Sequence, residues 1–180
     1  GIRIGGNYAR HPNRYKHHLR LTFRREYGPG RLRAPLFSRT SVDTFDNLIL
    51  RGGNSESWTF PASAGNGTTT RANVQYIRDQ FYKDAQVAMG HLSANQEYFH
   101  LYLNGLYWGF YTLIERIDGH FLSQHLGGEP EDYDAFKQSD TLIDGDRRAW
   151  DGMFRVSRGN MASARSYEVI QGLLDIDNFI

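Results

Sequence analysis

A single turn dipeptide places the strongest constraint on this chain, because it fixes where two strands must pair. Asn104-Gly105 suits a two-residue hairpin turn, in which both central residues take positive φ. Apolar and polar residues alternate on both sides of it, which is the period of a half-buried strand. The sequence therefore predicts an antiparallel hairpin in which Tyr98–Leu103 pairs with Leu106–Leu113.

Two further strands and one long helix are predicted to complete this sheet. Alternating apolar residues indicate strands over His18–Arg24 and Phe45–Arg51, and a short strand begins the chain. A helix is predicted over Arg71–Met89, with Gly90 at the position of a C-terminal cap. The apolar residues at helical spacing, expected to face the sheet, are Val74, Ile77, Phe81, Ala85 and Ala88.

The second half of the chain favours helices. They are expected over 117–126, 147–156 and 166–174, and residues 139–148 are expected to form a charged loop. Strands followed by helices, without a strand–helix alternation, are typical of an α+β fold. We predict an antiparallel sheet with packed helices.

Bulk properties exclude several classes of protein. The chain has 180 residues and no cysteine, so disulfides and thiolate metal sites are excluded, and no 18-residue apolar run suggests a membrane span. The length fits one domain over residues 1–180. The chain ends in the apolar run 177–180, and we interpret it as part of a longer domain that stops inside an element.

The charge is distributed very unevenly. Residues 1–39 hold ten Lys and Arg against one acid, a net +9, whereas the remainder holds 11 basic and 19 acidic residues, a net −8. A basic end of this kind is typical of phosphate or polyanion contact. The alternative is that it is neutralised by the acidic remainder of the same fold.

Three stretches, in this order, resemble the CotH (spore-coat protein H) kinase family. The first joins residues 1–7 (Gly-Ile-Arg-Ile-Gly-Gly-Asn), 16–24 (Lys-His-His-Leu-Arg-Leu-Thr-Phe-Arg) and 27–32. The second joins 45–54 (Phe-Asp-Asn-Leu-Ile-Leu-Arg-Gly-Gly-Asn) with Ile77-Arg-Asp79, Asp84 and Met89-Gly90. The third joins 101–111 (Leu-Tyr-Leu-Asn-Gly-Leu-Tyr-Trp-Gly-Phe-Tyr) with 114–118 (Ile-Glu-Arg-Ile-Asp).

This resemblance implies the N-terminal lobe of an atypical protein-kinase fold that binds ATP. It also implies a divalent metal, Mg or Mn, and transfer of phosphate to Ser or Thr of a protein substrate. In the family the metal-binding and catalytic aspartates lie in later segments resembling Asp-Gly-x-x-x-Asn and Trp-Asp-x-Asp, and neither pattern occurs here. The expectation is a nucleotide-binding part that lacks the C-terminal part of its domain and is inactive alone, with no catalytic residue or metal ligand assigned.

Other functions remain open at this point. Some family members act in spore coats or as cell-surface adhesins, so a non-catalytic surface or coat module is the alternative, and a secreted, cell-surface or coat location follows from resemblance only. A polyanion-binding domain is a third hypothesis. Nucleic acid is the weakest partner, because the aromatic residues lie in strand patterns rather than between basic residues.

Three residues are the candidates for contact with the nucleotide. Lys16 lies at the start of a predicted strand and matches a basic family position, and Glu115 is its expected carboxylate partner, as kinases pair a lysine with a glutamate. Arg78 lies on the long helix and also matches a family position. We predict that the three converge on one cleft; structural ion pairs are the alternative. Asp84 and Asp118 are expected in capping or ion-pair roles.

Overall fold

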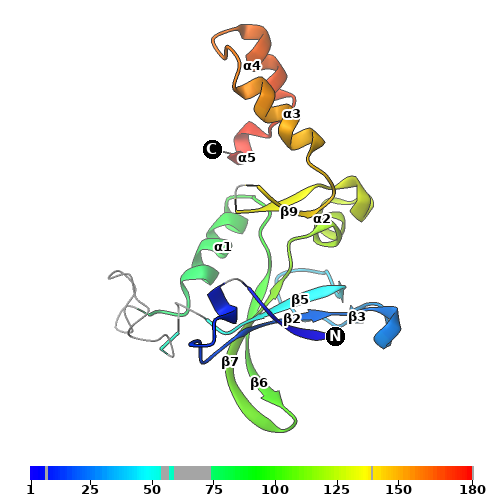
Figure 1. Cartoon of the computed structure of the whole chain (residues 1–180), viewed down its shortest axis with the longest axis vertical. Coiled ribbons are helices and arrows are strands. Elements are labelled where there is room, and N and C mark those ends of the chain that lie inside the picture. The colour runs from blue at the N-terminus through cyan, green and yellow to red at the C-terminus, as the bar shows by residue number, and fades with distance from the viewer. Residues whose placement is uncertain (7, 54–56, 59–73, 139, 180) are drawn as a thin grey trace. The chain divides into compact units, whose positions relative to one another are not determined.

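Five antiparallel strands form the main sheet of the protein, in the order β1-β2-β5-β7-β6 (Figure 1). The structure is a computed structural model that describes residues 1–6, 8–53, 57–58, 74–138 and 140–179. The chain divides into two compact units, Gly1–Ile117 and Asp118–Ile180. Antiparallel strands together with several helices make the fold α+β, as predicted.

In its described residues, the first unit contains the sheet, two short strands and one α-helix. Its elements are β1 (Ile2–Gly5), η1 (Tyr8–Arg10), β2 (His18–Thr22), η2 (Arg25–Tyr27), β3 (Leu32–Arg33), β4 (Thr44–Phe45), β5 (Asn47–Arg51), α1 (Arg78–Ala88), β6 (Gln96–Leu103) and β7 (Leu106–Glu115). The second unit contains α2 (Gly119–Leu126), η6 (Pro130–Asp132), β8 (Ala135–Lys137), β9 (Thr141–Asp144), α3 (Arg148–Ser157), α4 (Ala164–Gln171) and α5 (Ile176–Phe179).

The predicted hairpin is confirmed. β6 and β7 pair antiparallel from Gln96↔Ile114 to Leu103↔Leu106, around Asn104 at φ 49° and Gly105 at φ 82°. Both φ values are positive, as the turn type requires. The register shifts by one residue at Leu101 and Tyr102, where a bulge interrupts the pairing.

The hydrophobic core lies on one face of the sheet. The register places Leu48, Leu50, Leu113 and Tyr111 on that face, since residues two apart on a strand point the same way. The segment between β3 and β4 covers them with the buried Phe37, and the whole cluster is shielded from water. The opposite face carries His18 and Arg51, and Arg51 meets Asp79 of α1 there.

The predicted strand over Phe45–Arg51 is in fact two strands. Phe45 belongs to β4, which pairs with β3 in a separate two-stranded sheet, and β5 begins only at Asn47. The interruption at Asp46 turns the ring of Phe45 into the core, where it meets Phe37 edge-on at 5.5 Å between centroids. Burial of both aromatic rings explains why one continuous strand does not form.

The predicted helix over Arg71–Met89 is shorter and faces differently. Helical structure begins at Arg78, residues 71–73 lie outside the described residues, and Tyr76 at φ 60° has left the helical region. Ile77 and Phe81, expected to face the sheet, are 61% and 66% exposed. Polar side chains make the contacts of α1 with the sheet instead.

The second unit contains a strand pair that the sequence did not predict. β8 and β9 pair antiparallel, and β9 lies in residues 139–148, the segment expected to be a charged loop. The expected helices are present as α2, α3 and α4 with shifted ends. Asp118 accepts a hydrogen bond from the Phe121 N–H at 3.2 Å and caps α2, which confirms the capping role predicted for it. No helix in the described ranges has the length and apolar character needed to cross a membrane.

Candidate functional site

Lys16 is held against the middle of β7. Its ammonium donates a hydrogen bond to the Phe110 carbonyl and lies 4.7 Å from the centre of the Tyr111 ring and 5.9 Å from that of Tyr76. Both distances are within the range of a cation–π contact. Burial lowers the pKa of Lys16, because the charged form loses water.

Gly52 allows the segment of Lys16 to approach β5. A Cβ at Gly52 would lie 3.0 Å from the Lys16 Cβ and 3.1 Å from the His17 carbonyl, both tighter than ordinary van der Waals contact. A larger residue would therefore push Lys16 away from β7. Gly52 therefore sets the position of this lysine.

A strand cation and a helix carboxylate pair on the polar face of the sheet. Arg51, at the end of β5, contacts Asp79 of α1 at 2.6 Å, and Lys83, one turn further along α1, contacts the same Asp79 oxygen at 2.6 Å. Lys83 also donates to the Gln96 side chain of β6 at 2.9 Å. One carboxylate thus links two cations and ties α1 to the sheet.

The electrostatics of Asp79 follow from this arrangement. Burial favours a higher pKa for Asp79, but the hydrogen bond from Lys83 and the charge of Arg51 outweigh it and lower the pKa. For Lys83 the balance is opposite. Burial lowers its pKa more than Asp79 raises it.

His18 lies beside the cation Arg51 at this face. Pairing of Leu19 with Leu50 places His18 beside Arg51 on the adjacent strand. Burial, and then the positive charges of Arg51, His17 and Lys16, lower the pKa of His18 to about 4. Its Nε2 is buried and has no hydrogen-bond partner among the described residues. We call Lys16, His18, Arg51, Asp79 and Lys83 the β5–α1 cluster.

Tyr76 holds a strained conformation beside this cluster. It is a non-glycine residue at φ 60°, two positions before α1, and such strain persists only where neighbours fix it. Its hydroxyl hydrogen-bonds the buried Ser57 at 2.6 Å, and its carbonyl accepts from the Tyr98 hydroxyl at 2.9 Å. Its ring meets Trp58 at 5.3 Å and Phe110 at 5.7 Å between centroids.

The structure does not bring Lys16 and Glu115 together. The Glu115 carboxylate is buried and accepts hydrogen bonds from the Asn95 backbone and side chain at 2.7 and 2.8 Å. Phe110, the partner of Lys16, lies five residues earlier on β7, about 17 Å along an extended strand. The Lys16–Glu115 ion pair expected from the sequence is therefore replaced by two separate contacts.

The remaining predicted residues lie on α1. Arg78 is the first residue of the helix and is exposed, whereas Asp84 forms an ion pair with Arg39, as expected for a structural role. Convergence of Lys16, Arg78 and Glu115 on a nucleotide stays a prediction. Sequence reasoning missed the Arg51–Asp79–Lys83 contacts, although the spacing of Asp79 and Lys83 by four residues on a helix was a usable signal.

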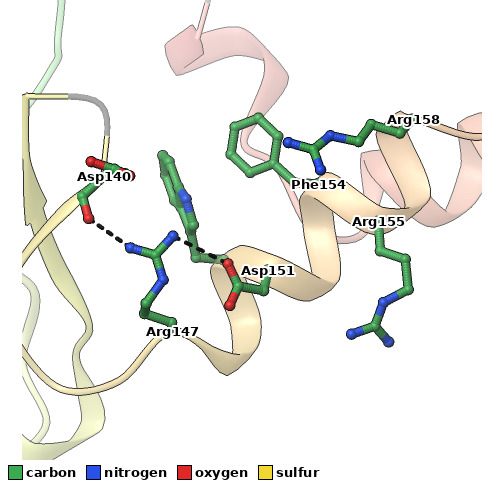
Figure 2. Close-up of a pocket in the computed structure, with 7 residues that line it drawn as sticks. Asp140, Arg147, Asp151, Phe154, Arg155 and Arg158 are labelled. Carbon is green, nitrogen blue, oxygen red and sulfur yellow. Dashed lines mark hydrogen bonds and ion pairs between the residues drawn. The ribbon is translucent and has the colours of Figure 1, made fainter.

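A groove of about 490 Å³ lies in the second unit, along α3 (Figure 2). Arg147 spans it, donating to the Asp140 carbonyl at 2.7 Å and to the Asp151 carboxylate at 3.3 Å. Trp150 stacks on Phe136 with centroids 4.8 Å apart. Because the charge of Arg147 is already met by Asp151, we interpret this groove as a structural contact between α3 and the β8–β9 pair.

The geometry can be compared with the requirements of ATP and a divalent metal. The β5–α1 cluster holds three cationic side chains against one carboxylate, which suits an anion such as a phosphate group. Among the described residues, no three His, Cys, Asp or Glu side chains gather as a metal ion would need. We therefore assign no metal ligand in the described part.

A comparison with known protein families identifies the family to which the chain belongs. The family described as CotH kinase protein matches residues 70–160, about half of the 180 residues. This chain belongs to the CotH kinase family. The part matched to CotH contains Arg78, Asp79, Lys83 and Glu115, whereas Lys16 precedes it. No curated protein and no solved structure matches the chain. Membership of the CotH family indicates a kinase-like function.

Proposed function

We propose that this chain binds the phosphates of ATP at the β5–α1 cluster and forms the nucleotide-binding part of a CotH-type protein Ser/Thr kinase. The observation that carries the proposal is the pair formed by Arg51 of the sheet and Asp79 of the helix. Kinases hold a strand cation with a helix carboxylate before the nucleotide arrives, because a long basic side chain must be fixed to meet a phosphate.

The charge of the cluster supports a phosphate ligand. Lys16, Arg51 and Lys83 carry three positive charges against the single carboxylate of Asp79, and all four side chains are partly shielded from water. An anion placed among them gains more than it would in bulk water, since the local dielectric is lower. Arg78, exposed at the first turn of α1, is a further cation that we propose for phosphate contact.

In this proposal Glu115 acts on the site through its neighbours and not by contact with the nucleotide. Its carboxylate holds Asn95, and the next residue, Gln96, accepts a hydrogen bond from Lys83. We propose that Glu115 positions Lys83 through this short segment and does not itself touch the nucleotide. The divalent metal, when bound, would neutralise part of the phosphate charge.

The distribution of lysines offers a sharp test. The chain has only three lysines, of which Lys16 and Lys83 belong to the cluster and Lys137 is exposed on β8. We expect Lys16→Met and Lys83→Met each to raise the dissociation constant for Mg·ATP about tenfold or more, roughly 1.4 kcal/mol, with Lys137→Met unchanged. Isothermal titration calorimetry gives these constants without requiring phosphate transfer.

A second measurement uses the lysines of the unmodified chain. Acylation with acetic anhydride, read by mass spectrometry, should be slowed at Lys16 and Lys83 by saturating ATP and unaffected at Lys137. Equal ATP affinity in all three methionine variants, or no protection of the cluster lysines, would contradict the proposal. The non-catalytic surface or coat module would then be the better account.

A further inference from the structure

The first unit has a second basic surface, separate from the β5–α1 cluster. Four arginines, Arg24, Arg25, Arg31 and Arg33, line a cleft of about 1150 Å³ around the turn between β2 and β3. All four side chains are exposed. Residues 24–33 contain one acid, Glu26, so this segment carries a net charge of +3.

Three of these four charges have no partner among the residues that the structure describes. Arg31 contacts Asp46 at 2.8 Å. In the described ranges, no carboxylate lies within ion-pair distance of Arg24, Arg25 or Arg33. Three guanidinium groups held close together without counter-charge repel one another, and an anion bound between them relieves that repulsion.

The cleft is partly preorganised. A Cβ at Gly30 would lie 2.9 Å from the Arg25 Cγ, so the glycine lets the Arg25 stem lie flat against the turn. Leu32 packs against the core, so Arg33, its neighbour on β3, is directed to the opposite side of the strand.

We infer that this cleft is a docking site for an acidic peptide that carries several carboxylates. The fork of an arginine matches a carboxylate, and Arg24, Arg25 and Arg33 are the lining groups that have no carboxylate partner among the described residues. The volume of the cleft exceeds what one carboxylate fills.

Other ligands fit the cleft less well. Small-molecule pockets are lined mainly by apolar and aromatic groups, whereas arginines dominate here. Single-stranded nucleic acid needs aromatic rings for its bases, and none lines this cleft. A membrane-binding surface needs a continuous apolar anchor, and among the lining residues only Pro29 and Leu32 are apolar. This inference does not depend on nucleotide binding.

The test uses a fluorescein-labelled peptide of four Glu-Ser repeats and fluorescence anisotropy on the whole chain. We expect Arg24→Gln/Arg25→Gln/Arg33→Gln to raise the dissociation constant at least tenfold. The charge-matched control Arg10→Gln/Arg155→Gln/Arg165→Gln changes three exposed arginines elsewhere and should raise it less than twofold. A peptide of four Gln-Ser repeats, which lacks the carboxylates, should bind at least tenfold more weakly.

Several results would overturn the inference. Equal losses in the two triple variants would mean general charge attraction, and equal affinity for the Gln-Ser peptide would exclude recognition of carboxylates. Tighter binding of oligothymidylate of matched charge would indicate a nucleic-acid surface instead. Circular dichroism checks folding, and the single Arg33→Gln replaces the triple variant if the latter unfolds, with an expected threefold loss.

Discussion

Acidification should destabilise the first unit through one histidine. His18 is buried on the edge of the β5–α1 cluster, and burial together with Arg51, His17 and Lys16 lowers its pKa from 6.5 to about 4. The unfolded chain binds a proton at His18 below pH 6.5, whereas the folded chain binds it only near pH 4. Unfolding therefore takes up a proton in this window, and stability falls as pH falls through it.

The size of the effect follows from the two pKa values. A fall from 6.5 to about 4 corresponds to about 3 kcal/mol, the stability expected to be lost between pH 7 and pH 4 through this group alone. That is a large share of the stability of an ordinary domain. Replacement His18→Gln removes the titrating group, so the pH dependence of the variant should be smaller by the same amount.

Urea unfolding followed by circular dichroism at pH 7, 5.5 and 4 measures this difference. His11→Gln is the matched control, because His11 is exposed in the loop before β2. The carboxylates titrate equally in all three proteins and cancel in the comparison. Parallel pH profiles for the wild type and His18→Gln would refute the reasoning, as would a His18 ring titration by NMR with its midpoint near 6.5.

Two further predictions concern stability. Asp79→Asn, which breaks both ion pairs of Asp79, should cost about 1–2 kcal/mol and lower the melting temperature by about 3–6 °C, with the same change at the exposed Asp43 nearly silent. Because the pKa of Asp79 is lowered, the stability difference between the wild type and Asp79→Asn should be present at neutral pH and shrink as pH falls below about 4. A stability difference that persists at pH 2 would contradict the role given to the ionised Asp79 carboxylate. Gly145→Ala should destabilise the second unit by at least about 2 kcal/mol, since φ is 78° and the new Cβ would lie 2.8 Å from the Asp134 backbone. Gly152→Ala, in α3 with open space around it, should instead stabilise by about 0.5–1 kcal/mol. Similar calorimetric melting temperatures for Gly145→Ala and Gly152→Ala would contradict both predictions.

Local patterns predicted the parts of the fold that depend on local chemistry. The hairpin around Asn104-Gly105 has its turn and alternation in one short stretch, so neighbouring residues determine its register. The β8–β9 pair was missed because each strand is short and lies among charged residues. Its pairing arises from contacts within the second unit, which no local period signals.

Local patterns were also insufficient to predict the contacts of the candidate site. Periodicity indicated a helix for α1, but the assumption that apolar residues face inward failed at Phe81, since Asp79 and Lys83 make the sheet contacts. Lys16 was singled out from its place at the start of a strand, but its partner could not be foreseen. That partner is a backbone carbonyl, and every residue has one, so the sequence carries no mark of the contact.

The edge-on contact of Trp58 with Tyr76 gives the molecule an intrinsic optical probe. The chain has three tryptophans, and the other two lie elsewhere, Trp108 on the β6–β7 hairpin and Trp150 on α3. Emission from Trp58 therefore reports events beside Lys16, while Trp150 reports the second unit. Chains that retain one tryptophan each would let the two units be followed separately in the same titration, without any added label.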